Sequence, residues 1–194
     1  MAQQPEPFTH VLAVLDRLQV EYCIGGSVAS SIWGRPRLTA DLDVALFASY
    51  AQLRELKEAL PQPDYYFDLQ SAMEAAGTGT MVTINHVTGV KIDLFFQTDN
   101  GFANSQMSRR RRVKTRGGLD AFLASPEDVV LNKLKYFKDG QSEKHLIDIA
   151  EVLKDQATTF DMNYTLDWAL RIGVRAEWEK SQLFATAWNA RKPS

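Results

Sequence analysis

Residues 24–47 read IGGSVASSIWGRPRLTADLDVALF, and they join a glycine turn to a pair of aspartates. The apolar segment before the glycines, Val20–Ile24, predicts a strand, and Ser27–Trp33 predicts a helix that begins with a capping serine. Glycines at a strand-to-helix junction let the backbone approach a phosphate closely, and the helix N-terminus supplies N–H groups that point at the anion. The candidate phosphate-binding residues are therefore Gly25, Gly26 and Ser27.

Asp41 and Asp43 lie two residues apart in Asp41–Phe47, a segment that predicts a second strand. Because side chains alternate along a strand, both carboxylates point to one face. An Asp-x-Asp pair also occurs in turns and at solvated strand edges, but this segment is too apolar for a loop. Two carboxylates on one face repel each other unless a cation lies between them. Mg²⁺ (or Mn²⁺), bound by one or two carboxylates and by substrate phosphates, is the cation that such a pair favours.

Three later segments extend the pattern: Val90–Phe96 reads VKIDLFF, Ser125–Leu134 reads SPEDVVLNKL, and Lys144–Ile149 reads KHLIDI. Taken with the glycine turn and residues 37–43, this order of motifs resembles the polymerase-beta-type nucleotidyltransferase superfamily. Within it the chain is most similar to the AbiEii-like nucleotidyltransferases, known chiefly as toxins of type IV toxin–antitoxin pairs. The resemblance implies an α/β (α+β) fold in which a mixed sheet with flanking helices carries the carboxylates and a helical C-terminal region follows.

The resemblance also implies a reaction and roles for individual residues. A nucleoside monophosphate would pass from a nucleoside triphosphate to an acceptor hydroxyl, with release of pyrophosphate. Asp93 would be the third carboxylate, acting as base and as an additional metal ligand beside Asp41 and Asp43. Lys133 would bind phosphate and act in catalysis, and Asp148 would act on the next helix. Two further residues near the phosphates would be Arg37 and Thr39.

The residues themselves leave other interpretations open. Asp93 alternates with apolar neighbours, so it could simply be a solvent-facing strand position. Lys133 lies at the border of an apolar stripe and could be solvated. Asp148 could be a surface acid or form a salt bridge with Lys144 or Lys133. The motif around Asp148 matches in part, because family members often have Arg-Asp where Lys144 and His145 stand.

The chain changes character between residues 100 and 120, where a polar and basic stretch separates the strand-rich part from a helical part. We therefore expect a catalytic domain over residues 1–105 and a mainly helical domain over residues 106–194 that contributes Lys133 and Asp148. The serine, proline and acids at the start of Ser125–Leu134 are typical of a helix N-terminus.

Composition narrows the class of protein. The chain has 194 residues, a net charge of −2 and one cysteine, Cys23, which cannot form an internal disulfide. These features fit a reducing cytoplasm. The sequence contains neither an apolar run long enough to cross a membrane nor the basic-then-apolar order of a signal peptide.

Arg109–Arg116 places six cations in eight residues. This run is either a solvated loop or a local patch that steers a polyanionic acceptor such as tRNA or another RNA through phosphate contacts. If the toxin relationship holds, a cognate antitoxin protein is expected. A small-molecule or protein acceptor stays open, as does a module that binds nucleotides without catalysis.

Overall fold

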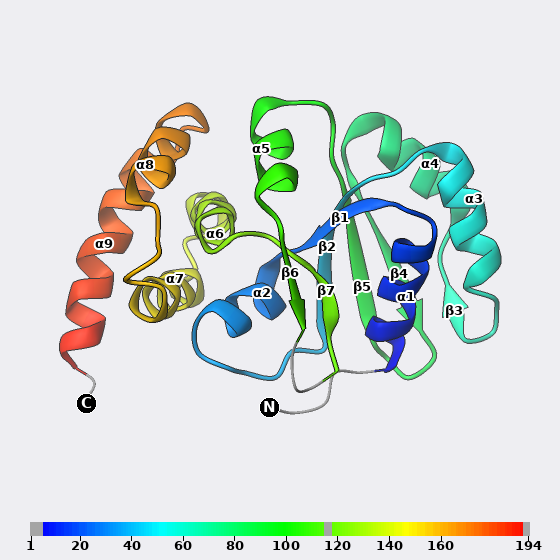
Figure 1. The fold of residues 1–194 in the computed structure, drawn as a ribbon, viewed down its shortest axis with the longest axis horizontal. Helices are drawn as coiled ribbons and strands as arrows, with labels where there is room; N and C mark the ends of the chain where they lie inside the picture. The colour runs from blue at the N-terminus through cyan, green and yellow to red at the C-terminus, as the bar shows by residue number, and fades with distance from the viewer. Residues whose placement is uncertain (1–5, 115–117, 192–194) are drawn as a thin grey trace. The chain divides into compact units, whose positions relative to one another are not determined.

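The computed structural model describes residues 6–114 and 118–191, which form two compact units. The first, which we call the sheet unit, is drawn from Met1–Val28 and Leu38–Leu123. The second, the helical unit, is drawn from Ala29–Arg37 and Ala124–Ser194. Each unit is described separately below (Figure 1).

The sheet unit is built on seven strands in the order β3-β4-β5-β2-β1-β7-β6. Their bounds are β1 Glu21–Ile24, β2 Asp41–Phe47, β3 Tyr65–Tyr66, β4 Met81–His86, β5 Lys91–Phe96, β6 Arg111–Lys114 and β7 Asp120–Leu123. The sheet is mixed, because β2 runs parallel to β5 and β1 runs parallel to β7, whereas the other neighbours are antiparallel. The mixed sheet expected from the sequence is therefore confirmed.

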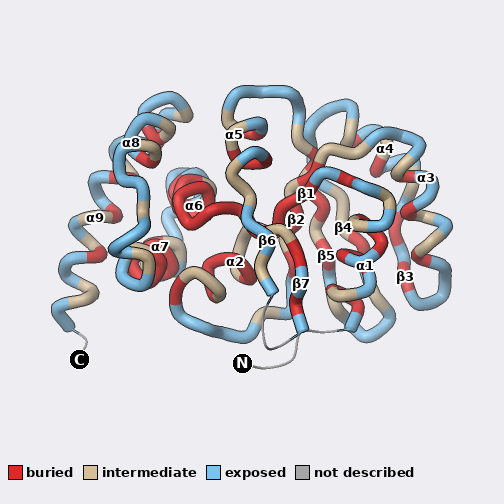
Figure 2. Tube along the Cα trace, viewed as in Figure 1, coloured by how far each residue is buried: buried red, intermediate tan, exposed pale blue. Residues whose placement is uncertain are grey.

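The sheet has one closed and one partly open face. Its helices are α1 Glu6–Arg17, α3 Tyr50–Ala59, α4 Leu69–Thr78 and α5 Gly101–Arg109. The Tyr22 hydroxyl donates to Asp16 of α1 at 3.1 Å, while the amide of Gln106 of α5 donates to Cys23 Sγ at 3.2 Å. Adjacent strand residues point to opposite faces, so α1 and α5 cover opposite faces of β1. On the α1 side, Leu42, Val44 and Leu46 of β2 are fully buried, and Figure 2 shows how buried positions concentrate along the central strands.

The helical unit packs α6 Pro126–Gly140, α7 Glu143–Asp155, α8 Met162–Arg171 and α9 Arg175–Ala190 against one another. Ser125 caps α6 as predicted, because its side chain accepts a hydrogen bond from the Asp128 N–H. Asp128 is itself fully buried and accepts from the hydroxyls of Ser125 and Tyr164, each at 2.7 Å. The acids of the first turn of α6 thus join the core of the unit, which goes beyond the helix-start role that the sequence suggested.

Helix α2 spans Gly26–Trp33. Ser27 therefore lies inside the first turn of the helix, whereas the predicted capping role required it to precede the helix. The later part of α2 belongs to the helical unit. Two hydrogen bonds explain this: the indole of Trp33 donates to the Ala124 carbonyl at 2.8 Å, and the amide of Gln156 donates to the Trp33 carbonyl at 2.9 Å.

The compact units do not divide at residue 105, where we expected a domain boundary, but between Leu123 and Ala124. The reason is that β7 pairs with β1 and carries β6 with it, so residues 106–123 complete the sheet. Within the described residues, the basic run is therefore not the solvated loop considered from the sequence, because Arg111–Lys114 forms the edge strand β6. Arg116, the last member of the run, lies outside the described residues.

Within residues 6–114 and 118–191, no helix has both the length and the apolar character that a membrane span requires.

Candidate active site

The open face of the sheet unit carries a row of acids at the start of two parallel strands. In the β2–β5 pair Asp43 lies directly opposite Asp93, and Asp41 lies opposite Lys91. Neighbouring strands are about 4.8 Å apart, so the Asp43 and Asp93 side chains start side by side. Both residues are partly exposed, whereas Leu42 and Ile92, which point to the other face, are fully buried. The alternating pattern of the strands thus sets both acids on the accessible face.

The glycine turn lies directly against one of these acids. Gly26 has a φ of +54°, a backbone conformation that side chains rarely adopt. A Cβ placed on Gly26 would lie 1.7 Å from Oδ2 of Asp43, and the Gly25 N–H donates to the Asp43 carbonyl at 2.9 Å. Two constraints therefore favour glycine at position 26. The backbone has a positive φ there, and the Asp43 carboxylate fills the space that a side chain would need. Gly25, Gly26 and Ser27 stand where the sequence predicted a phosphate-binding turn, next to Asp43.

Asp93 is held by a residue that sequence reasoning missed. Thr83 of β4 lies opposite Asp93, and its hydroxyl donates to Asp93 Oδ1 at 2.5 Å. The loop between the strands sets this register, because the His86 N–H donates to the Val90 carbonyl at 2.9 Å and Thr83 then falls opposite Asp93. A two-residue turn at Thr88–Gly89 would have paired position 83 with position 94, so this contact did not follow from the sequence. The open face thus carries Thr83, Asp93 and Asp43 in one row across three strands.

The donor set fits a hard divalent cation in a limited form. Among the described residues, no three His, Cys, Asp or Glu side chains gather closely enough to hold a metal ion. The predicted ligand set of Asp41, Asp43 and Asp93 stays a prediction, with Asp41 on the same face of β2 as Asp43 and two residues nearer the start of the strand. Two adjacent carboxylates still fit Mg²⁺, which often binds one or two carboxylates and completes its shell with phosphates and water.

Thr39 stands beside the acids, where its hydroxyl hydrogen bonds with the backbone of Asp41, donating to the carbonyl at 3.2 Å and accepting from the N–H at 3.4 Å. It orders the entry to β2. Its predicted contact with phosphate stays a prediction.

The remaining predicted site residues belong to the helical unit and form an ion-pair cluster there. Lys133 Nζ lies 2.7 Å from Asp148 Oδ2, and Arg37 Nη2 lies 3.2 Å from the same oxygen. The side chains of Lys133 and Asp148 are 5% and 11% exposed, so this is a buried pair. The structure thus brings Lys133, Asp148 and Arg37 together, and it favours the salt-bridge interpretation of Asp148 that the sequence left open.

His145 adjoins this cluster. Its ring stacks on Tyr136 of α6 with centroids 5.9 Å apart, and its Nδ1 is buried without a hydrogen-bond partner among the described residues. Burial, with repulsion from Lys133 and Lys144, lowers the pKa of His145 below 6.5, although Asp148 acts in the opposite direction. The neutral ring is therefore the form that the fold prefers.

The basic segment is partly neutralised inside the sheet unit. Arg110 pairs with Glu21 at 2.9 Å, and Arg112 pairs with Asp16 at 2.9 Å and with Asp120 at 2.7 Å. These bonds raise the pKa of Arg112 further, chiefly through Asp120. Arg110 and Arg112 also both lie over the Phe122 ring, 4.9 Å from its centroid. Two arginines of the predicted RNA-binding run thus anchor the edge of the sheet.

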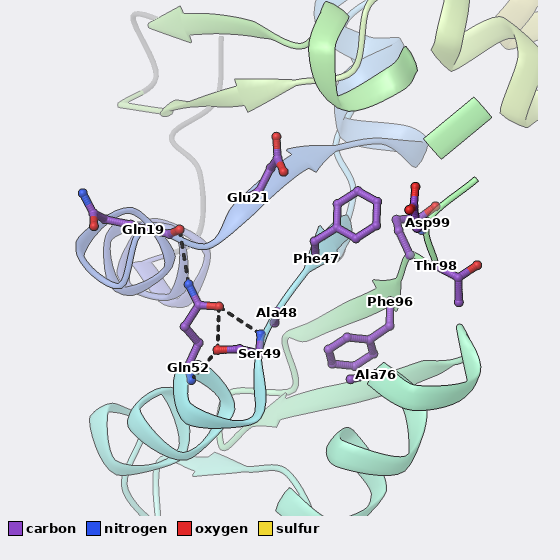
Figure 3. Close-up of a pocket in the computed structure, with 11 residues that line it drawn as sticks. Gln19, Glu21, Phe47, Ala48, Ser49, Gln52, Ala76, Phe96, Thr98 and Asp99 are labelled. Atoms are coloured by element: carbon purple, nitrogen blue, oxygen red, sulfur yellow. Dashed lines mark hydrogen bonds between the residues drawn. The ribbon is translucent and has the colours of Figure 1, made fainter. Parts of the chain in front are cut away.

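A pocket of about 590 Å³ lies elsewhere in the sheet unit (Figure 3). It is lined by residues at or just after the ends of β2 and β5, among them Phe47, Phe96 and Asp99. The acids stand at the opposite ends of these strands, and Asp43 and Phe47 are about 13 Å apart along β2. The size of this pocket therefore does not identify the chemistry, and we take the acid row as the candidate active site.

No protein-family model and no curated protein sequence matches the chain. Solved structures do match. The crystal structure of ANT(2")-Ia in complex with adenylyl-2"-tobramycin aligns with a TM-score of 0.55 and 13% identity over 95% of this chain and 96% of that chain. The solution structure of the antibiotic-resistance factor ANT(2'')-Ia gives a TM-score of 0.51 and 12% identity over the same shares. The lincosamide antibiotic adenylyltransferase LnuA, lincomycin-bound, gives 0.52 and 14% over 78% of this chain and 98% of that chain. At these identities the likeness concerns architecture alone, and the chain has the fold of the polymerase-beta-type nucleotidyltransferases.

Proposed function

We propose that the protein is a Mg²⁺-dependent nucleotidyltransferase that moves a nucleoside monophosphate from a nucleoside triphosphate to an acceptor hydroxyl. One observation carries the proposal. Asp43 and Asp93 lie side by side on the accessible face of the sheet, and the glycine turn at Gly26 lies directly against Asp43. The nucleotidyltransferase fold supports this interpretation of the two carboxylates and the glycine turn, because an anion-binding turn beside two carboxylates suits a metal-bound triphosphate.

In this proposal, the residues of the sheet unit bind the triphosphate and the metal ion and orient the acceptor hydroxyl. The turn at Gly25, Gly26 and Ser27 would hold phosphate oxygens through the first N–H groups of α2. Asp43 and Asp93 would hold Mg²⁺, which when bound neutralises the charge of the phosphates. Asp93 would also accept the proton of the acceptor hydroxyl as that oxygen attacks the α-phosphorus and pyrophosphate leaves. Positioning and charge neutralisation would supply most of the rate, without a covalent enzyme intermediate.

Asp41, Thr39, Lys133, Arg37 and Asp148 have a weaker claim to this chemistry. In the structure Thr39 binds the backbone of Asp41, and the other three form an ion-pair cluster. We keep their contacts with metal or phosphate as predictions.

Two acceptor classes follow from different observations. The resemblance in sequence favours an RNA acceptor such as tRNA, with a toxin role and an antitoxin partner in the cytoplasm as further predictions. The pairing of Arg110 and Arg112 with carboxylates weakens the argument for RNA binding. An arginine whose charge is already compensated by a carboxylate contributes less to the affinity for phosphates. Two of the matching solved structures hold adenylyl-2"-tobramycin and lincomycin, which supports a small hydroxyl-bearing organic acceptor as the second candidate.

The test is a label-transfer assay with each α-³²P nucleoside triphosphate, Mg²⁺, and three acceptor mixtures: total RNA, cell-lysate protein, and a set of aminoglycosides and lincosamides. We expect Mg²⁺-dependent label in one mixture and none with Asp43→Ala. Nucleotide binding without label transfer, unchanged by EDTA and by Asp43→Ala, would instead identify a module that binds nucleotides without catalysis.

A further inference from the structure

The acid row of the sheet includes a neutral side chain. Thr83, Asp93 and Asp43 occupy matching positions on β4, β5 and β2, because Thr83 lies opposite Asp93 and Asp93 lies opposite Asp43. All three are partly exposed, so the row faces the accessible side of the sheet. Asp93 therefore has a carboxylate on one side and a hydroxyl on the other.

The hydrogen bond between Thr83 and Asp93 is short. The distance of 2.5 Å from Thr83 Oγ1 to Asp93 Oδ1 is at the short end of the range for O–H···O hydrogen bonds. The other acceptor within reach of this hydroxyl is Met81 Sδ at 3.6 Å, a weak acceptor, so the carboxylate is the preferred partner. Threonine is β-branched and stiff at χ1, which makes it a fixed donor in a strand.

The hydrogen bond from Thr83 helps to hold Asp93 in place beside a second carboxylate, Asp43. Two carboxylates that start about 4.8 Å apart repel each other, and each would turn away in the absence of a cation. Among the described residues, Thr83 is the one hydrogen-bond partner of the Asp93 side chain. A donor on the β4 side fixes Oδ1 and so limits the rotation of the carboxyl group about its bond to Cβ.

We infer that Thr83 is a positioning residue for the metal site: its hydroxyl occupies Oδ1 of Asp93, so that Oδ2 is the oxygen that a divalent cation shared with Asp43 would bind. The inference rests on the proposed function, because it assumes that Asp43 and Asp93 hold the cation. It assigns Thr83 no contact with substrate. Threonine here acts through Asp93, as residues behind a metal ligand commonly do.

The experiment compares Mn²⁺ affinity in full-length variants, measured by the EPR signal of free Mn²⁺ with no nucleotide present. Thr83→Val keeps the shape and the strand preference of threonine but removes the hydroxyl, whereas Thr83→Ser keeps the hydroxyl. We expect Thr83→Val to bind Mn²⁺ about 10-fold more weakly and Thr83→Ser to bind within about 2-fold of the wild type. Thr186→Val, which removes a threonine hydrogen bond in α9, serves as the matched control and should bind as the wild type.

A second readout separates positioning from a loss of structure. In the transfer assay, Thr83→Val should raise the Mg²⁺ concentration needed for half-maximal rate by about 10-fold, and saturating Mg²⁺ should restore most of kcat. A variant that was merely less stable would lose rate at every Mg²⁺ concentration. If Thr83→Val does not fold, Thr83→Ala removes the same hydroxyl and takes its place.

The outcomes also distinguish the two proposals. Wild-type Mn²⁺ binding that depends on Asp43 but is unchanged in Thr83→Val would overturn the role of Thr83 and leave the proposed function standing. Both proposals would be overturned if the wild-type protein binds no Mn²⁺ either alone or with a non-hydrolysable nucleoside triphosphate, or if Asp43→Asn binds Mn²⁺ as tightly as the wild type does. An equal loss in Thr83→Ser and Thr83→Val would show that packing, and not the hydroxyl, matters, and it too would overturn the inference.

Discussion

Asp93 of the sheet unit and Asp148 of the helical unit were both expected to act in the reaction, yet their surroundings differ. Asp93 is partly exposed and receives a hydrogen bond from a neutral hydroxyl at 2.5 Å. Asp148 is nearly buried and receives two cations, Lys133 at 2.7 Å and Arg37 at 3.2 Å. A neutral hydroxyl does not compensate the charge of a carboxylate, so Asp93 can still bind a cationic ligand. The charge of Asp148 is compensated by the two cations that it already binds.

The difference shows what a motif leaves undetermined. Each aspartate has a plausible place in the same sequence pattern, but burial and the charge of its partners separate a ligand-binding role from a stabilising one. We propose that the acid row carries the chemistry and that the Lys133–Asp148 ion pair contributes stability, while the contacts of Lys133 and Asp148 with metal or phosphate stay predictions. Each of the following predictions tests one side of that assignment.

The largest effect should come from Asp43→Asn. This substitution keeps the shape of the side chain but removes the charge beside Asp93, so we expect nucleotidyl transfer to fall about 10³-fold. Circular dichroism and the unfolding midpoint should stay close to those of the wild type, because the acid row is not part of the core. Transfer within about 10-fold of the wild-type rate would place the chemistry elsewhere.

Asp148→Asn should act on stability. The substitution removes the buried ion pair between Lys133 and Asp148, and we expect the free energy of unfolding to fall by about 3 kcal/mol. Urea unfolding measures it. The matched control is Asp167→Asn, which breaks an exposed pair with Arg171 at 2.9 Å and should cost about 0.5 kcal/mol or less. Equal losses for the two substitutions would contradict the contrast between buried and exposed pairs.

Gly26→Ala should impair the acid row through geometry. A Cβ 1.7 Å from Asp43 Oδ2 must displace that carboxylate, so we expect about 100-fold slower transfer. Gly89→Ala is the control, because Gly89 also has a positive φ, of +84°, but no atom lies within 4 Å of its Cβ position. Both variants carry backbone strain, and a similar loss of transfer in both would mean that the contact with Asp43 is unimportant.

The smallest effect concerns pH and His145. Burial lowers the pKa of His145 in the folded protein, so below about pH 6.5 the unfolded chain binds the proton more readily than the fold does. Stability should therefore decrease as pH falls from about 7.5 to about 5.5. His145→Gln removes this contribution, and urea unfolding at both pH values should show a smaller decrease in the variant. An identical decrease in both proteins would show that other groups account for it.

The part of the fold that could be predicted from sequence is the part where one pattern dominates. The apolar alternation in Asp41–Phe47 predicted β2 with its bounds and placed Asp41 and Asp43 on one face. Thr88–Gly89 between two apolar segments is typical of a hairpin turn, and β4 and β5 do pair as an antiparallel hairpin. Helix α6 followed from the cap at Ser125, and the spacing of Phe8, Val11, Leu12 and Leu15 is typical of the helix observed as α1.

Other features depend on partners that are distant in sequence. β6 is rich in arginine because it is an exposed edge strand, and its strand character comes from pairing with β7. From sequence alone, Arg112 is a candidate phosphate-binding cation. The structure shows that it pairs with Asp16, which is 96 residues away in the chain. The burial of the Lys133–Asp148 pair likewise depends on how the helices pack.

The most direct test of the proposed site is a crystal of the protein soaked with Mn²⁺ and a non-hydrolysable nucleoside triphosphate, analysed by anomalous scattering. We predict an Mn²⁺ peak about 2.1 Å from carboxylate oxygens of both Asp43 and Asp93, with the triphosphate at the N-terminus of α2. A peak at other acids, such as Glu21 and Asp99 of the pocket, with none between Asp43 and Asp93, would contradict the account.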